Sequence, residues 1–64
     1  MNSRLNNLKE IIEDRGLRQE CIAKRVGVDP SVMSLWVNNK RQPNGIHLVK
    51  LAKVINCKAE DIYD

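Results

Sequence analysis

The chain has 64 residues, which is enough for one small domain and too short for a catalytic domain with a substrate cleft. A domain of this size buries only about 60% of its unfolded surface. With no Phe, one Trp and one Tyr, its core must consist of Leu, Ile and Val around Trp36. No apolar run approaches the ~18 residues of a membrane span, and the N-terminus lacks a signal-peptide pattern. We therefore expect a cytoplasmic protein with no membrane partner.

Positive charge is concentrated in one part of the sequence. The formal net charge is +3, but the stretch from Arg15 to Arg41 holds six basic and two acidic residues, a balance of +4 that leaves −1 for the remainder. Such a concentration favours contact with nucleic-acid phosphates. A total of +3 is also ordinary for a soluble protein, so charge alone leaves both interpretations open.

The first predicted helix runs from Asn2 to Arg15. Ser3 can cap its N-terminus, Gly16 ends it, and Leu17 is expected to return to the core. Its apolar stripe consists of Leu5, Leu8, Ile11 and Ile12. The charged residues between them form a solvated face, to which we assign no chemistry.

The second predicted helix begins near Arg18 and ends at Gly27, a residue that accepts positive φ. Its apolar face consists of Ile22, Ala23 and Val26. Asp29 can cap the next helix through its carboxylate, and Pro30 suits the first helical position. Two short helices joined by a turn with Gly are typical of a helix-turn-helix.

The third predicted helix, from about Pro30 to Asn38, has two different faces. The apolar face, with Val32 at its margin, is predicted to be buried and consists of Met33, Trp36 and Val37. The opposite face consists of Ser31, Ser34, Leu35 and Asn38. Because this second face is small and carries no acid, the helix can come close to phosphates and base edges.

Two further helices are predicted, from about Gly45 to Ile55 and from about Ala59 to Tyr63. Asn44 can cap the first of them, Asn56 can end it in the left-handed conformation, and His47 should be exposed on it. Its inward residues are Leu48, Leu51, Ala52 and Ile55. Near the C-terminus, two interpretations stay open: an exposed apolar patch for a second subunit, or residues that close the core. The residues concerned are Val54, Cys57, Ile62 and Tyr63.

Several of these residues stand in a characteristic order. The first run is Gln19-x-x-Ile22-Ala23-x-x-x-Gly27-Val28-Asp29-x-Ser31-x-Met33-Ser34-x-Trp36-x-Asn38-Asn39-Lys40-Arg41-x-Pro43, and the second is Leu48-x-x-Leu51-Ala52-x-x-Ile55-Asn56-Cys57-Lys58-x-x-x-Ile62-Tyr63. In these runs the chain resembles the Cro/lambda-repressor type (XRE) helix-turn-helix family over almost its whole length. The resemblance implies an all-α fold: a compact, five-helix, lambda-repressor-like DNA-binding domain spanning residues 1–64. Its helix-turn-helix would comprise helices 2 and 3, about residues 18–38.

The same resemblance implies roles for individual residues. The third helix would enter the major groove of double-stranded DNA while the second crosses the backbone. The expected base-reading residues are Pro30, Ser31, Ser34 and Leu35. The expected phosphate-binding residues are Arg18, Gln19, Asn38, Asn39, Lys40, Arg41 and Asn44. For Gln19 the alternative is a purely structural role at the helix N-terminus, and for Leu35 it is that of an ordinary exposed leucine.

The chain departs from the family pattern at three places. Relatives often read bases with Gln, Arg or Asn, and the reading face here has none before Asn38. DNA shape or a partner subunit would then supply more of the specificity. Many relatives join helices 1 and 3 by an Arg–Glu pair, where this chain has Ile12 and Val37. An apolar pair there is compatible with the fold, because no charges need to be desolvated. Finally, Asn39 stands where relatives usually have Gly, and Asn tolerates the left-handed conformation.

The resulting hypothesis is a transcription regulator, most simply a repressor that binds a palindromic operator as a homodimer, of the kind found in phages or mobile elements. The alternative is a protein-interaction module, such as an antitoxin or antirepressor-type partner of a regulatory protein. An enzyme is not expected, since no catalytic constellation or phosphate-cradling Gly loop is present. We expect no cofactor and no metal site. Cys21 and Cys57 lack metal-binding spacing and are expected to be reduced.

Overall fold

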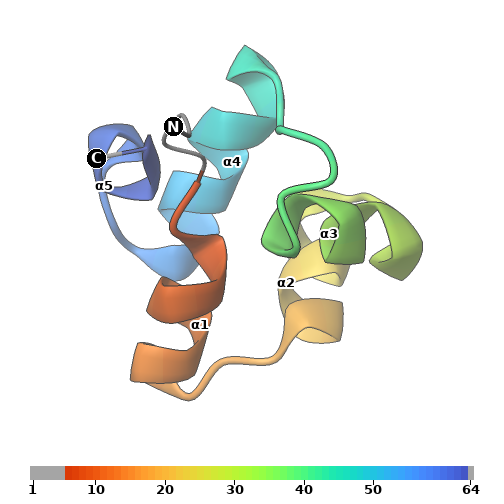
Figure 1. Ribbon diagram of the computed structural model, residues 1–64, viewed down its shortest axis with the longest axis horizontal. Coiled ribbons are helices and arrows are strands. Elements are labelled where there is room, and N and C mark those ends of the chain that lie inside the picture. Colours follow the sequence, from red (N-terminus) through yellow and green to blue (C-terminus); the bar gives the residue numbers. More distant parts are fainter. Residues whose placement is uncertain (1–5, 64) are drawn as a thin grey trace.

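Five helices make up the part of the chain that the structure, a computed structural model, describes, residues 6–63. Along the chain they are α1 (Leu8–Arg15), α2 (Gln19–Val26), α3 (Pro30–Val37), α4 (Gly45–Ile55) and α5 (Ala59–Tyr63). The α2–α3 pair packs on one side of α4, and α5 packs on its other side beside the start of the described chain (Figure 1). The prediction of an all-α, five-helix fold is confirmed.

Every helix contributes to one aliphatic core. Met33, Trp36 and Val37 of α3 are buried as predicted, and Ile12 and Val37 both lie in this core. Burial of a large aliphatic side chain contributes about 1.5–3 kcal/mol, so these positions carry most of the stability. The remaining buried apolar residues of the helices are Leu8, Ile22, Ala23, Val26, Leu51, Ala52, Ile55 and Ile62.

The helix ends follow the predicted chemistry. Gly16 and Gly27 end α1 and α2 with φ of 65° and 91°. Asn39 and Asn56 take left-handed conformations, with φ of 60° and 68°. Asn adopts this conformation more readily than other residues with a side chain, because its short polar side chain can form local hydrogen bonds.

The start of α1 differs from the prediction. The helix begins at Leu8 rather than Asn2, because Asn6 and Asn7 are used in tertiary contacts. The side chain of Asn6 accepts a hydrogen bond from the Leu8 N–H (3.0 Å), and the Asn7 N–H donates to the carbonyl of Ile62 (2.7 Å). The predicted cap Ser3 and the predicted stripe residue Leu5 lie outside the described residues.

The exposure of two other side chains was predicted wrongly from the sequence. Leu17 does not return to the core but is 37% exposed, since its N–H closes the end of α1 on the Ile12 carbonyl (2.9 Å) and its side chain stays at the rim. His47 is half-buried rather than exposed, because its ring packs on Trp36 with centroids 5.1 Å apart.

The C-terminal apolar residues mostly close the core. Ile62 is fully buried, and Val54, Cys57 and Tyr63 are partly buried against the core. Both cysteines are free, and burial raises the pKa of the Cys57 thiol. The large exposed apolar side chains in the described part of the chain are instead Leu17, Ile46 and Val49.

Candidate nucleic-acid interface

The N-terminal end of α3 is built by residues adjacent in sequence. Asp29 is the N-cap, and its carboxylate accepts hydrogen bonds from the Ser31 N–H (3.0 Å) and the Ser31 hydroxyl (2.8 Å). These two bonds lower the pKa of Asp29, which is therefore ionised at neutral pH. Pro30 occupies the first helical position, where its missing N–H costs no hydrogen bond.

The outer face of α3 is accessible as predicted. Ser31 and Asn38 are exposed, and Ser34 and Leu35 are half-buried, while the opposite face of the helix packs into the core. No acidic side chain lies on the helix itself, but the Asp29 carboxylate stands directly beside Ser31. This negative charge follows from the predicted capping role of Asp29.

The two serines on this face have different hydrogen-bonding capacities. A carboxylate can only accept hydrogen bonds, so Ser31 donates its hydroxyl hydrogen to Asp29. The lone pairs of the Ser31 hydroxyl remain available to accept a hydrogen bond from a ligand. Ser34 Oγ instead accepts from Asn38 Nδ2 (3.3 Å), which leaves its own hydrogen for donation. Asn38 also donates to the Ser34 carbonyl (2.9 Å) and so terminates the helix.

The turn after α3 carries exposed cations. The N–H groups of Lys40 and Arg41 both donate to the Leu35 carbonyl, at 2.9 and 3.2 Å, while their side chains lie in solvent. Asn39 is half-buried, and its side chain is bonded to Asn6 and Gln42. Asn39 Nδ2 donates one of its two hydrogens to the Asn6 carbonyl, so one remains for a phosphate.

The N-terminus of α2 is open to an anion. Arg18 occupies the N-cap position but makes no side-chain cap, whereas α3 and α4 are capped by Asp29 and Asn44. The first N–H groups of a helix without a cap, and its positive dipole end, attract negative charge. Arg18 and Gln19 are exposed, and they line one surface depression together with Pro30 at the start of α3.

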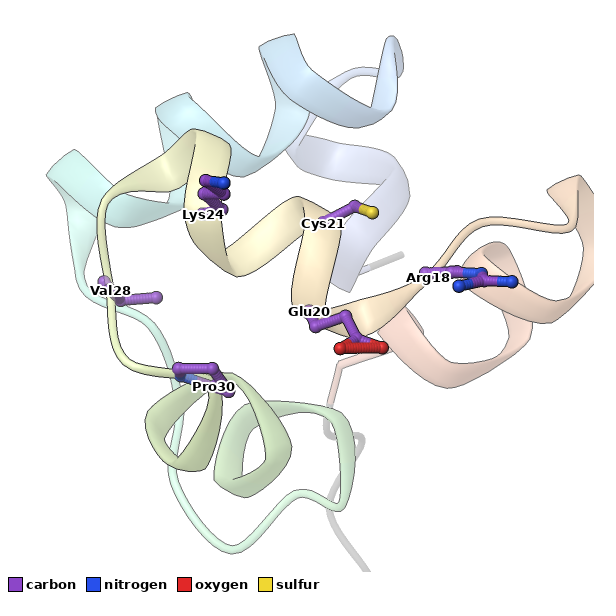
Figure 2. A pocket seen from close by; sticks show the side chains of 6 residues that line it. All are labelled: Arg18, Glu20, Cys21, Lys24, Val28 and Pro30. Atoms are coloured by element: carbon purple, nitrogen blue, oxygen red, sulfur yellow. The ribbon is translucent and has the colours of Figure 1, made fainter.

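A second depression, of about 530 Å³, lies beside the first, between α2 and the start of α3 (Figure 2). Glu20, Cys21 and Lys24 reach it from α2, and Val28 and Pro30 from the turn and the first residue of α3. It is open to solvent and combines charges of both signs, so it forms the flank of the helix-turn-helix rather than an enclosed ligand site.

The far side of α3 has a matching group of residues. Arg41 and Asn44 line a common depression with Trp36 and His47. Asn44 Oδ1 caps α4 by accepting from the His47 N–H (3.0 Å), as predicted, and its amide nitrogen is left to face a ligand. A Cβ on Gly45 would meet no atom within 4 Å, so the α4 N-terminus can be approached closely.

The structure thus places all eleven predicted residues at the surface, in groups around α3. Pro30, Ser31, Ser34 and Leu35 belong to the helix, Arg18 and Gln19 join its N-terminal end, and the remainder follow its C-terminal end. One basic residue of the charged stretch has a different use: Arg15 Nη1 donates to the carbonyls of Ile55 (2.6 Å) and Asn56 (2.9 Å) at the end of α4. Side-chain capping of a helix end 40 residues away leaves no local signal in the sequence.

The described residues show neither of two other kinds of site. Within residues 6–63, no group of three or more His, Cys, Asp or Glu side chains could hold a metal ion. No helix in the same range is long and apolar enough to cross a bilayer.

Comparison with known proteins agrees with this geometry. A family model described as Helix-turn-helix matches residues 8–62. Comparison with curated protein sequences gives no significant match. Among solved structures, a putative DNA-binding protein from Bacteroides fragilis superposes with a TM-score of 0.86 at 28% identity, over 91% of this chain and 94% of that chain.

Two structures of the P22 c2 repressor are also similar. Its DNA-binding domain in solution gives a TM-score of 0.77 at 30% identity, over 94% of this chain and 82% of that chain. The crystal structure of the repressor with synthetic operator 9T gives 0.75 at 28% identity, over 83% and 80%. The chain therefore belongs to the helix-turn-helix family of the Cro/lambda-repressor (XRE) type, whose fold is that of DNA-binding regulators.

Proposed function

We propose that this protein is a sequence-specific transcriptional regulator, a repressor that binds a palindromic operator as a homodimer with α3 in the major groove. The observation that carries the proposal is the exposed polar face of α3 between two groups of candidate phosphate-binding residues. Such residues fix the protein on the DNA backbone, and the helix between them reads the bases. The P22 c2 repressor, similar over most of this chain, is known in complex with an operator.

The phosphate-binding residues divide between the two flanks of α3. On one flank, the uncapped N-terminus of α2 with Arg18 and Gln19 would bind one phosphate. On the other, Lys40 and Arg41 would bind the backbone beyond the groove, supported by Asn44. Asn39 would complete that side through its remaining amide hydrogen. Asn38 would do so by releasing one of the two hydrogen bonds that its amide nitrogen donates to Ser34.

Base reading would fall to Pro30, Ser31, Ser34 and Leu35. Ser31 offers lone pairs and would accept from the amino group of adenine or cytosine. Ser34 keeps its hydrogen and would donate to guanine or to thymine O4. Leu35 and Pro30 would pack on a thymine methyl. The substitution Ser31→Ala should erase a preference at one base position, and Ser34→Ala at another.

Selection of binding sites from a random duplex pool tests the proposal directly. We expect a palindromic consensus with half-sites about 10–10.5 base pairs apart, or a multiple of that distance. Sedimentation with and without the selected duplex should show two chains on each palindrome. A consensus with one half-site bound by a single chain would contradict the homodimer while leaving DNA binding intact.

A variant pair separates DNA binding from a protein-interaction role of the same surface. Lys40→Ala with Arg41→Ala should weaken binding to all duplexes, because both side chains would contact phosphates. The matched control is Lys9→Ala with Lys58→Ala, which removes the same charge from α1 and from the residue before α5. Equal effects of the two double variants would show that only net charge matters. No binding of the wild type to any duplex would favour the interaction module instead.

A further inference from the structure

The turn that carries Lys40 and Arg41 is attached to the rest of the protein through one buried side chain, Asn6. It is 5% exposed and is the one buried polar residue among those described. Its amide nitrogen donates to the Trp36 carbonyl (2.8 Å) and to Gln42 Oε1 (2.9 Å), and its Oδ1 accepts from the Leu8 N–H (3.0 Å). Both amide hydrogens and the amide oxygen are thus used, which fixes the position of this side chain.

Asn39, in the turn, forms hydrogen bonds with the backbone of Asn6. Its Oδ1 accepts from the Asn6 N–H (2.9 Å) and from Gln42 Nε2 (3.2 Å), and its Nδ2 donates to the Asn6 carbonyl (3.4 Å). Asn39 has a left-handed backbone (φ 60°), which Gly would adopt more easily. A glycine, however, would have no side chain to bind the backbone of Asn6. Compared with glycine, asparagine at this position has a less favourable backbone conformation but supplies hydrogen bonds to Asn6.

The C-terminal helix joins the same network. The Tyr63 hydroxyl donates to Gln42 Oε1 (3.1 Å), the oxygen that also accepts from Asn6. We call these four residues, Asn6, Asn39, Gln42 and Tyr63, the Asn6 network. It joins the start of the described chain and the end of α5 to the residues on either side of Lys40 and Arg41.

We propose that the Asn6 network is a positioning device for DNA binding: it holds the turn so that Lys40 and Arg41 face the backbone before DNA arrives. The proposal rests on the proposed function. Lys40 and Arg41 are otherwise attached through single N–H bonds to the Leu35 carbonyl, and their side chains are exposed. A turn ordered beforehand need not lose its conformational freedom on binding, which improves affinity without any new contact.

The test must separate positioning from general stability. Asn6→Ala is the obvious variant, but it removes the centre of a buried network and can unfold a small domain. Gln42→Ala is better suited, because it removes the bonds to Asn6, Asn39 and Tyr63 from an exposed side chain that is not among the proposed phosphate-binding residues. Tyr63→Phe removes only the hydroxyl bond. The control is Asn56→Gly, which removes an exposed amide side chain at the end of α4, outside the network.

The experiment is a double-mutant cycle read by fluorescence anisotropy on the selected duplex, with folding of each variant checked by circular dichroism. In the wild-type background, Gln42→Ala should weaken affinity roughly fivefold, the order expected when side chains must be ordered during binding. Tyr63→Phe should weaken it less, and Asn56→Gly should leave it unchanged. In the background Lys40→Ala with Arg41→Ala, Gln42→Ala should change affinity by less than about twofold.

Each outcome of this experiment either supports or overturns the proposed role of the Asn6 network. Equal losses from Gln42→Ala in both backgrounds would overturn the proposal, because the network would then act independently of the two cations. An affinity that Gln42→Ala leaves unchanged in the wild-type background would overturn it as well. If the wild-type protein binds no duplex, the proposed function fails first, and that outcome is recognised before any variant is measured.

Discussion

The two ends of α3 are held in different ways. At the N-terminal end, Asp29 binds the N–H and hydroxyl of Ser31, two residues away. At the C-terminal end, Asn6 reaches the Trp36 carbonyl and the Gln42 side chain across 30 and 36 positions. The first end could form in an isolated peptide, whereas the second requires the folded domain. Helix α3 is therefore started by local hydrogen bonds, and its C-terminal end is held to the rest of the domain by tertiary ones.

This difference leads to unequal consequences of mutation. A local cap costs little to lose and can be replaced by another short acceptor at the same position. A buried network leaves several partners unsatisfied when its central member is lost, and each buried unsatisfied group is costly.

The largest effect should come from the centre of the Asn6 network. Asn6→Ala leaves the Leu8 N–H without its partner and removes one of the two hydrogen bonds that the Trp36 carbonyl accepts, the other coming from the Asn39 N–H (3.1 Å). It should lower the free energy of unfolding by about 2–3 kcal/mol. Urea denaturation followed by circular dichroism measures this. Asn38→Ala serves as the comparison, because Asn38 bonds only within its own turn and should cost about 0.5 kcal/mol. Similar losses in the two variants would remove the distinction between local and long-range hydrogen bonds.

The next effect distinguishes the two left-handed asparagines. Asn56→Gly should stabilise the domain by about 0.5 kcal/mol, because Gly suits the left-handed end of α4 and no side-chain role is lost. Asn39→Gly should instead destabilise it by about 1 kcal/mol, because the links to Asn6 exceed the relief of the backbone. Thermal unfolding of both variants gives the comparison. Stabilisation by both substitutions would mean that the relief of the backbone at Asn39 exceeds the contribution of its hydrogen bonds to Asn6.

A local cap should behave as replaceable. Asn44→Ala removes the acceptor of the His47 N–H and should cost about 1 kcal/mol, while Asn44→Ser should restore most of that loss. Asn6→Ser should restore little of the Asn6→Ala loss, since a hydroxyl cannot span both the Trp36 carbonyl and Gln42. Full recovery by Asn6→Ser would show that the long-range network tolerates replacement as a local cap does.

The smallest effect is a pH dependence at Asp29. Hydrogen bonds from the Ser31 N–H and hydroxyl lower the pKa of Asp29 in the folded state below its value in the unfolded chain. The stabilisation is therefore complete above the unfolded-state pKa and disappears as the pH falls through the lowered folded-state pKa. Asp29→Asn keeps a capping oxygen but does not titrate. As the pH falls from about 5 to about 2, the melting temperature of the wild type should thus decrease relative to that of Asp29→Asn. A constant difference over this range would contradict the assigned role of the carboxylate.

Sequence reasoning succeeded where the signal was local. Apolar spacing predicted the buried residues Met33, Trp36 and Val37, and the caps Asp29 and Asn44 were recognised from residue type and position. These features depend on neighbours within one or two helical turns, and such patterns are visible in a single sequence. The five helices follow from them.

The misplaced residues have tertiary causes. Helix α1 begins at Leu8 because Asn6 and Asn7 bind distant parts of the chain, and His47 is covered because it meets Trp36. Asn39 was predicted to be left-handed, but nothing in the sequence shows that its side chain binds Asn6, 33 positions away. For the interface, the family pattern names the residues, and the structure adds which hydrogens Ser31 and Ser34 have left to offer.

The most direct test of the central claim is the salt dependence of binding to the selected duplex by the wild-type protein. If Arg18, Gln19, Lys40, Arg41 and their neighbours bind phosphates, the logarithm of the association constant should fall linearly with the logarithm of salt concentration. The slope should be about −0.9 for each phosphate neutralised, and lower in magnitude for Lys40→Ala with Arg41→Ala. A nearly flat response between about 50 and about 200 mM salt would contradict DNA binding through this surface.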